Sequence, residues 1–221
     1  MPRRSLAEHR PWLLAAWACA ILYYVLSDEA LGETWQIAVK AGAVLSLAIY
    51  AIRRHGGTDA KILAGSLVLA AVGAALDVLQ IDFAAIALFF SYAAAIALFL
   101  RHRRERPVGS QKALAITVLL VTPLLALWRT QSADVGIYAL TLGAMGFAGW
   151  MSAFPRYRVG TGTMLVVAAG LLSFLPADPT DTFGLAAWLE WPLFFVGQFM
   201  IATGVVQTLR HQDKLRREAG R

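Results

Sequence analysis

The chain alternates between long apolar runs and short polar segments. Eight apolar runs fill most of its 221 residues, and most approach the ~20 residues that a helix needs to cross a bilayer. The runs are continuous and do not alternate apolar with polar side chains, which disfavours membrane β-strands. The pattern therefore predicts an all-α fold, a polytopic membrane bundle of eight transmembrane helices in a single domain over residues 1–221. The predicted spans are residues 11–27, 35–52, 60–80, 83–100, 113–128, 135–154, 159–175 and 183–209, followed by a basic tail at 210–221.

The composition agrees with an integral membrane protein. The chain is 58% hydrophobic and 15% charged, whereas soluble domains are about half apolar and a quarter charged. The net charge of +6 does not indicate nucleic acid as a partner, because the basic residues lie in loops that set topology and meet anionic lipid. Cys19 is the single cysteine, which excludes an internal disulfide and a cysteine metal cluster.

The distribution of charge between alternate loops predicts the orientation. The N-terminus, every second loop and the tail together hold 18 of the 20 Lys and Arg residues. Because basic residues gather on the cytoplasmic side, we expect both termini to be cytoplasmic, in a bacterial inner (plasma) membrane. The opposite loops carry acidic residues instead, namely Asp28, Glu29, Glu33, Asp82, Asp134, Asp178 and Asp181.

Three ionisable residues lie inside predicted spans at similar depth from the non-cytoplasmic side. At 1.5 Å per helical residue, Lys40, Asp77 and Glu190 are roughly 9, 8 and 10 Å deep. Charged side chains in a bilayer are costly and pair with one another, so we expect the three to share a cavity open to that side. The alternatives are a snorkelling lysine, a carboxyl in interfacial water, or a Lys–Asp pair that only holds helices together. Gln198 lies deeper, where an interhelical hydrogen bond is the simplest role.

No metal or cofactor is expected. The four histidines fall in loops or termini without ligand spacing, and there is no glycine-rich phosphate loop and no serine nucleophile elbow. The residues carry no signal for an oligomeric state.

The order of several polar and small residues along the spans is similar to a known family. Lys40 stands early in the second span, and Asp77 follows the run GAAL in the third. With these landmarks the chain resembles the YhhN family of eight-span membrane proteins, which includes the lysoplasmalogenases. The further matches are Phe83, Tyr138, Met145, Gly162 before TMLVV, and Gln198 within FFVGQFMIA.

The resemblance implies a membrane hydrolase without a cofactor. Such an enzyme would cleave the vinyl ether of a lysoplasmalogen, a membrane lysophospholipid, to a fatty aldehyde and a glycerophospho-alcohol. Asp77 is then the expected general acid/base, Lys40 its tuning partner or a phosphate contact, and Tyr138 and Gln198 are further substrate-binding residues.

One departure from the family concerns the second carboxyl. The family often carries a Ser–Asp pair in its seventh span, where this chain has Ala169 and Gly170. Glu190 is the residue that we expect to replace the missing acid. Two other function classes stay open: a non-catalytic family member that binds or senses lipid, and a small transporter that uses Lys40, Asp77 and Glu190 as a proton or ion relay.

Overall fold

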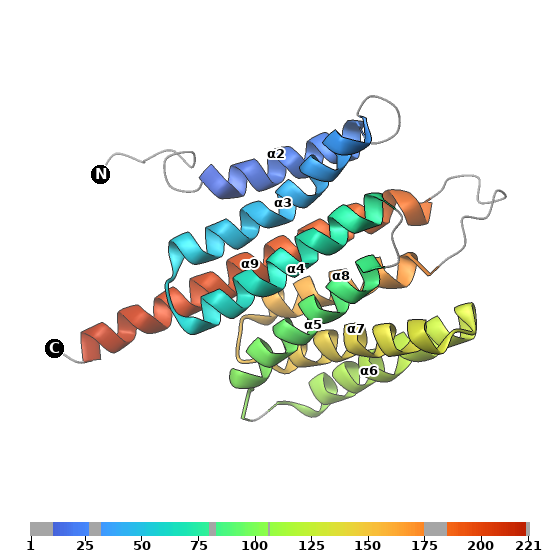
Figure 1. Cartoon of the computed structure of the whole chain (residues 1–221). Coiled ribbons are helices and arrows are strands. Elements are labelled where there is room, and N and C mark those ends of the chain that lie inside the picture. The colour runs from blue at the N-terminus through green and yellow to red at the C-terminus, as the bar shows by residue number, and fades with distance from the viewer. Residues whose placement is uncertain (1–10, 27–31, 80–82, 106, 175–184, 220–221) are drawn as a thin grey trace. The chain divides into compact units, whose positions relative to one another are not determined.

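The structure is a computed structural model that describes residues 11–26, 32–79, 83–105, 107–174 and 185–219 (Figure 1). Every regular element within these ranges is a helix, as the sequence predicted. The helices group into two compact units, Met1–Ser91 and Tyr92–Arg221. Some predictions concern residues outside the described ranges, namely the first ten positions and the loop acids Asp28, Glu29, Asp82, Asp178 and Asp181.

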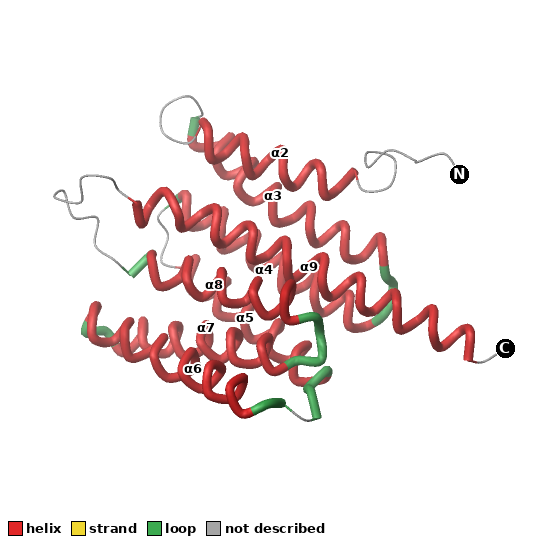
Figure 2. The backbone as a smooth tube through the Cα atoms, turned by 180° about the vertical axis from the view of Figure 1, so that it is seen from behind, coloured by secondary structure: helices red, strands yellow, loops and turns green. Residues whose placement is uncertain are grey.

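The first unit contains helices α2 (Pro11–Leu26), α3 (Glu33–Arg54) and α4 (Thr58–Val78) and the first part of α5 (Phe83–Arg101). α3 packs against both α2 and α4, and the figures show the three side by side (Figures 1 and 2). The side chains of Ala43, Leu47 and Ala51 are fully buried. Because they recur every four residues, they form one ridge of α3, and the small size of Ala43 and Ala51 allows neighbouring backbones to come close.

A reciprocal pair of serine hydrogen bonds joins α4 to α5. The Ser66 hydroxyl donates to the carbonyl of Ser91 at 2.9 Å, and the Ser91 hydroxyl donates to the carbonyl of Ser66 at 2.8 Å. Both residues are buried. About two turns further along α4, Gly73 faces Leu88, and a Cβ at Gly73 would lie 2.7 Å from Leu88 Cγ. The two helices therefore meet closely, with polar contacts that need no water.

The second unit contains the rest of α5 with α6 (Gly109–Thr130), α7 (Ala133–Met151), the π-helix η1 (Arg156–Gly160), α8 (Thr161–Leu172) and α9 (Leu185–Ala219). α6 and α7 form a hairpin that turns at Gln131, which adopts φ 53°, and its N–H donates to Leu127 O at 2.9 Å. This left-handed residue ends α6 in the way that a glycine usually does.

Glycines set how closely the helices of the second unit approach. A Cβ at Gly143 of α7 would lie 3.3 Å from the carbonyl oxygen of Leu119. That carbonyl lacks its helical donor, because Pro123 four residues later has no N–H. α8 and α9 cross even more tightly: a Cβ at Gly162 would lie 2.8 Å from Gly197 O, and one at Gly197 would lie 2.7 Å from Gly162 O.

Five described helices are long and apolar enough to cross a membrane. They are α3, α4, α5, α6 and the part of α9 from Trp188 to Ala219, whereas α2 is apolar but has only 16 residues. On α6 the large apolar side chains Leu124 and Trp128 are 62% and 73% exposed, as expected of a surface that faces lipid. These helices support a polytopic membrane protein, while the full set of eight spans stays a prediction.

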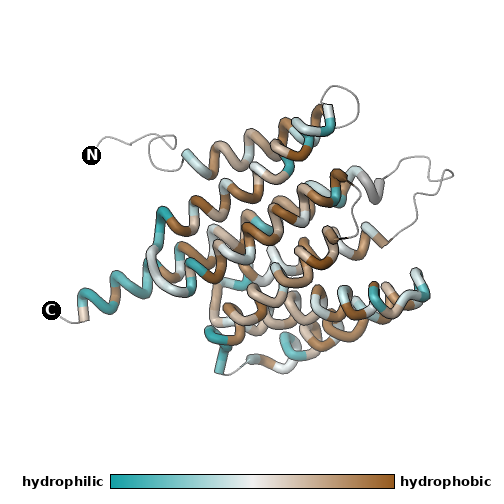
Figure 3. Tube along the Cα trace, in the orientation of Figure 1, coloured by the Kyte–Doolittle hydropathy of each residue, from teal (hydrophilic) through white to brown (hydrophobic). Residues whose placement is uncertain are grey.

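The largest difference from the predicted boundaries is at the C-terminus. The span was expected to end at residue 209 and to be followed by a solvated tail, but α9 continues as one helix to Ala219. Figure 3 shows this last part of α9 as hydrophilic. Lys214 and Glu218 form an i,i+4 ion pair at 3.7 Å, the kind of pair that supports an exposed helix. A drop in hydropathy therefore marked the end of the apolar run and not the end of the helix.

Candidate functional site

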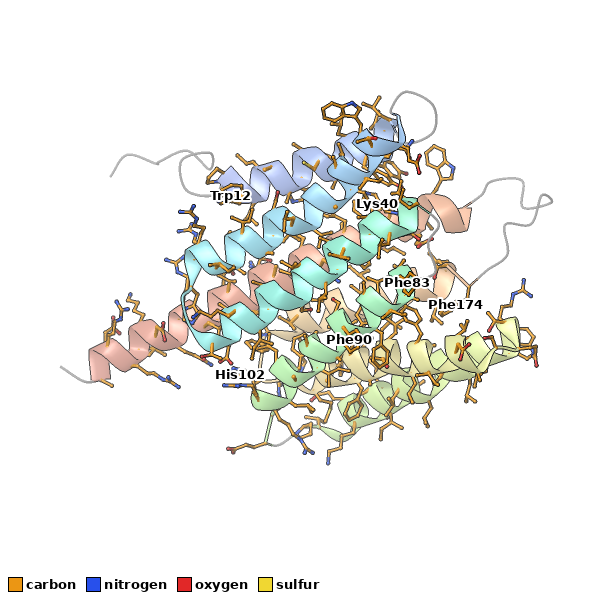
Figure 4. All side chains as sticks on the ribbon, in the orientation of Figure 1. Trp12, Lys40, Phe83, Phe90, His102 and Phe174 are labelled. Atoms are coloured by element: carbon orange, nitrogen blue, oxygen red, sulfur yellow. The ribbon has the colours of Figure 1, made fainter. Side chains whose placement is uncertain are left out.

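Lys40 is the cation that α3 buries. The residue is only 9% exposed, and Figure 4 labels it beside the C-terminal end of α4. A lysine so enclosed needs an opposite charge or strong hydrogen-bond acceptors, because burial of an unpaired ammonium is costly. Its surroundings therefore define the first candidate site.

The partner of Lys40 is Asp77 on α4. Lys40 Nζ forms a salt bridge and hydrogen bond with Asp77 Oδ2. The same Nζ lies 5.1 Å from the centroid of the Tyr23 ring on α2, within the range of a cation–π interaction. Three helices of the first unit thus contribute one side chain each to the Lys40–Asp77–Tyr23 cluster.

The two ends of the ion pair differ in access. The side chain of Lys40 is 11% exposed, whereas that of Asp77 is 54% exposed. Asp77 is the next-to-last residue of α4, which ends at Val78, closer to the helix end than the predicted depth implied. A carboxylate at the C-terminus of a helix meets the negative end of the helix dipole. Lys40 offsets this repulsion, while the open side of Asp77 leaves a carboxyl oxygen accessible to another molecule.

A second polar group lies within the other unit. The hydroxyls of Tyr92 on α5 and Tyr138 on α7 are 3.4 Å apart, and their ring centroids are 5.9 Å apart. Tyr92 also interacts electrostatically with Glu190 on α9, and Phe174 lies edge-on to Tyr138 with a centroid distance of 6.1 Å. The predicted residues Tyr138 and Glu190 therefore both approach Tyr92, which is 2% exposed.

Gln198 lies deeper in the second unit. It is 5% exposed on α9, on the helix that also carries Phe195 and Phe199, whose ring centroids are 6.4 Å apart. Trp191 continues this aromatic row and lies 6.0 Å from Phe195. Among the described residues, no group of three or more His, Cys, Asp or Glu side chains comes together as a metal site.

A comparison with protein families identifies the family of the chain. The YhhN family model matches residues 35–205, which is most of the chain. The chain belongs to the YhhN family. No curated protein and no solved structure matches it. The match includes Lys40, Asp77, Tyr138, Glu190 and Gln198, whereas Tyr23 lies before it.

Gly170, which the resemblance to the family aligned with an acid, lies against a neighbouring helix. Gly170 is buried on α8, and a Cβ there would lie 2.5 Å from Leu142 Cδ2 of α7. The side chain of Leu142 thus fills the space in which an aspartate would project. A leucine side chain can move, so the space is occupied by a flexible group and not by backbone.

Sequence reasoning missed Tyr23 and Tyr92. Tyr23 stands at the end of an apolar run, where a tyrosine usually belongs to the interfacial aromatic belt. Tyr92 stands in the middle of an apolar span, which is the signal that could have singled it out, because a buried tyrosine hydroxyl requires a polar partner. In both cases, the role of the tyrosine depends on how its helix is rotated about its own axis. The apolar pattern of these spans does not determine that rotation.

Proposed function

We propose that this YhhN protein is a lysoplasmalogenase-like membrane hydrolase, which cleaves the vinyl ether of a lysoplasmalogen to a fatty aldehyde and a glycerophospho-alcohol. The observation that carries the proposal is the Lys40–Asp77 ion pair, with the lysine enclosed and the carboxyl half open. The resemblance of the sequence to the lysoplasmalogenases supplies the reaction type. The lipid substrate lies in the bilayer and can reach the helices without passing through water.

The reaction needs one group that gives a proton and later accepts one. Asp77, in its acid form, donates a proton to the vinyl carbon that is not bonded to oxygen, and the other vinyl carbon becomes an oxocarbenium ion. Water adds to this ion and returns a proton to the Asp77 carboxylate, which leaves a hemiacetal. The hemiacetal then collapses to the aldehyde and the alcohol, so protons balance over the cycle. A positioned carboxyl contributes about 10²–10⁴-fold to such a step.

Lys40 and Tyr23 have supporting roles in this scheme. After proton donation, the ammonium of Lys40 stabilises the Asp77 carboxylate and fixes which of its oxygens faces outward. The Tyr23 ring restrains the Lys40 side chain from the other side. An ammonium is also a suitable contact for the phosphate of the substrate, and Tyr138 and Gln198 are proposed as further substrate contacts.

The direct test is the release of aldehyde from lysoplasmalogen by the purified protein in detergent. We expect fatty aldehyde and glycerophospho-alcohol in equal amounts, and no product from the saturated ether analogue, which cannot be protonated at carbon. The expected products form only if the vinyl ether is cleaved by hydrolysis. Binding of both lipids without turnover would contradict the proposal and would identify a non-catalytic lipid-binding protein.

The non-catalytic alternative is favoured by one observation, the side chain of Leu142 against Gly170 in place of the usual acid. Replacing Gly170 with aspartate and Leu142 with alanine together should therefore raise vinyl-ether hydrolysis by about tenfold or more, up to the ~10²–10⁴-fold of one positioned acid–base group. Gly170→Asp alone should give less, because the new carboxyl overlaps Leu142.

The controls for this prediction distinguish the effect of a second carboxyl on the rate from the effect of changed packing at Leu142. Leu142→Ala alone should not raise the rate. A robust wild-type rate with no gain in the double variant would show that another carboxyl already serves, and a loss of that rate in Glu190→Gln would identify it as Glu190. The proposed role of Glu190 would be wrong if Glu190→Gln left the rate unchanged.

A further inference from the structure

The segments that follow α5 and α7 are joined to each other at one end of the second unit. Arg103 and Ser152 form an antiparallel bridge, and the N–H of Ala153 donates to the carbonyl of His102 at 2.6 Å. Figure 4 labels His102 at the C-terminal end of α5. The joined segments form an end of this unit that is rich in basic residues, where we expect the headgroup region of a bilayer to lie.

Two arginines without a carboxylate partner meet there. The guanidinium of Arg104 donates to the carbonyl oxygens of Ser152 at 3.3 Å and Phe154 at 3.4 Å. Partial burial lowers the pKa of Arg104, and the positive charge of Arg156 lowers it further. Within the described residues, neither arginine forms an ion pair. The fold therefore brings two like charges close together, and a bound anion would offset their repulsion.

Two buried donors at the same place also lack acceptors. Arg156 Nε and the indole Nε1 of Trp150 are buried and have no hydrogen-bond partner within the described residues. Both side chains meet at Gly160 in η1: a Cβ there would lie 2.9 Å from Trp150 Cε3 and 3.6 Å from Arg156 Cβ. A larger residue than glycine would separate them. Buried donors are normally satisfied, so both N–H groups are candidates for donating to an acceptor other than the described residues.

We propose that Arg104, Arg156 and Trp150 form a binding site for the phosphate of an anionic phospholipid in the leaflet next to the basic loops. Phosphate oxygens accept several hydrogen bonds at once and match the planar fork of a guanidinium. A lipid headgroup is favoured over phosphate in solution because the site lies at the ends of helices, and the exposed faces of these helices are apolar. Tyr157, in the same π-helix, is 90% exposed, as suits a side chain at the headgroup level.

The experiment measures lipid binding to the purified full chain in detergent by native mass spectrometry. Phosphatidylglycerol is titrated against phosphatidylcholine, and a third titration uses inorganic phosphate. Wild-type protein should bind phosphatidylglycerol most tightly. Arg156→Gln should weaken that binding about tenfold, the effect of losing a charge-assisted hydrogen bond. Trp150→Phe removes the indole N–H but keeps an aromatic ring, so it should weaken the binding by a smaller factor.

The matched control is Arg103→Gln, which removes the same charge from an exposed position next to Arg104 and should leave the affinity nearly unchanged. Equal losses in Arg103→Gln and Arg156→Gln would overturn the site and leave only general attraction between charges. Tight binding of inorganic phosphate that depends on Arg156 would overturn the assignment to a lipid. If Arg156→Gln does not fold, an unchanged affinity in Trp150→Phe overturns the proposal in its place, and a reduced one supports it.

Discussion

Replacing Asp77 with asparagine should reduce aldehyde release from lysoplasmalogen by at least about 100-fold, because the carboxyl proposed to donate the proton to the vinyl carbon is lost. The amide also leaves the ammonium of Lys40 enclosed without its counter-charge. The ion pair is half open, so the cost should fall between ~1 kcal/mol for exposed pairs and ~3–5 kcal/mol for buried ones. Turnover and thermal unfolding should be measured on the same detergent-purified samples.

A double variant separates the chemistry from the stability. Lys40→Met with Asp77→Asn removes both charges, so it should unfold at a higher temperature than Asp77→Asn alone but should remain inactive. Asp134→Asn, an exposed acid in the first turn of α7, is the matched control and should keep the wild-type rate. Recovery of turnover in the double variant would show that Asp77 acts only by balancing the charge of Lys40.

Replacing Gly197 with alanine should strongly destabilise the protein. The new Cβ would lie 2.7 Å from the carbonyl oxygen of Gly162 and 2.7 Å from Val166 Cγ2. The first of these atoms belongs to the backbone of α8 and cannot rotate away, so the two helices must separate. We expect a cost of about 1–3 kcal/mol for alanine and loss of the folded protein for valine, measured by thermal unfolding and by size-exclusion yield.

Gly65 provides the control for this substitution. It lies within α4, and a Cβ at this position would meet no atom within 4 Å. Gly65→Ala should therefore be neutral or should stabilise the protein by about 0.5–1 kcal/mol, since alanine favours a helix over glycine. A similar loss from both substitutions would mean that glycine is needed for another reason than the close crossing of α8 and α9.

The helices were predictable where the chain is uniformly apolar. α5 was expected at residues 83–100 and is observed at Phe83–Arg101, because charged residues follow its apolar run directly. α9 was less predictable, since its last ten residues are polar yet helical. Apolar runs report contact with lipid, whereas helical structure outside the bilayer depends on local propensity and pairs such as Lys214 with Glu218.

The candidate site was predictable only in part. The expectation that Lys40 and Asp77 approach each other rested on their similar depth and on the cost of a lone charge in lipid, and the structure pairs them. The contact of Lys40 with Tyr23 was not expected. The predicted depth gives the position of a residue across the bilayer but not the direction in which its side chain leaves the helix. The closed space at Gly170 could not be inferred either, because it depends on which rotamer Leu142 adopts from a different helix.

The reciprocal serine bonds between α4 and α5 have a consequence for how the chain enters the bilayer. In a single helix each hydroxyl could donate only to a carbonyl of its own helix, as Ser46 does to Gly42 at 2.7 Å. Because Ser66 and Ser91 satisfy each other, the two helices present less polar surface together than apart. We therefore expect α4 and α5 to leave the insertion machinery as a preformed hairpin, with their relative height fixed before the later helices are synthesised.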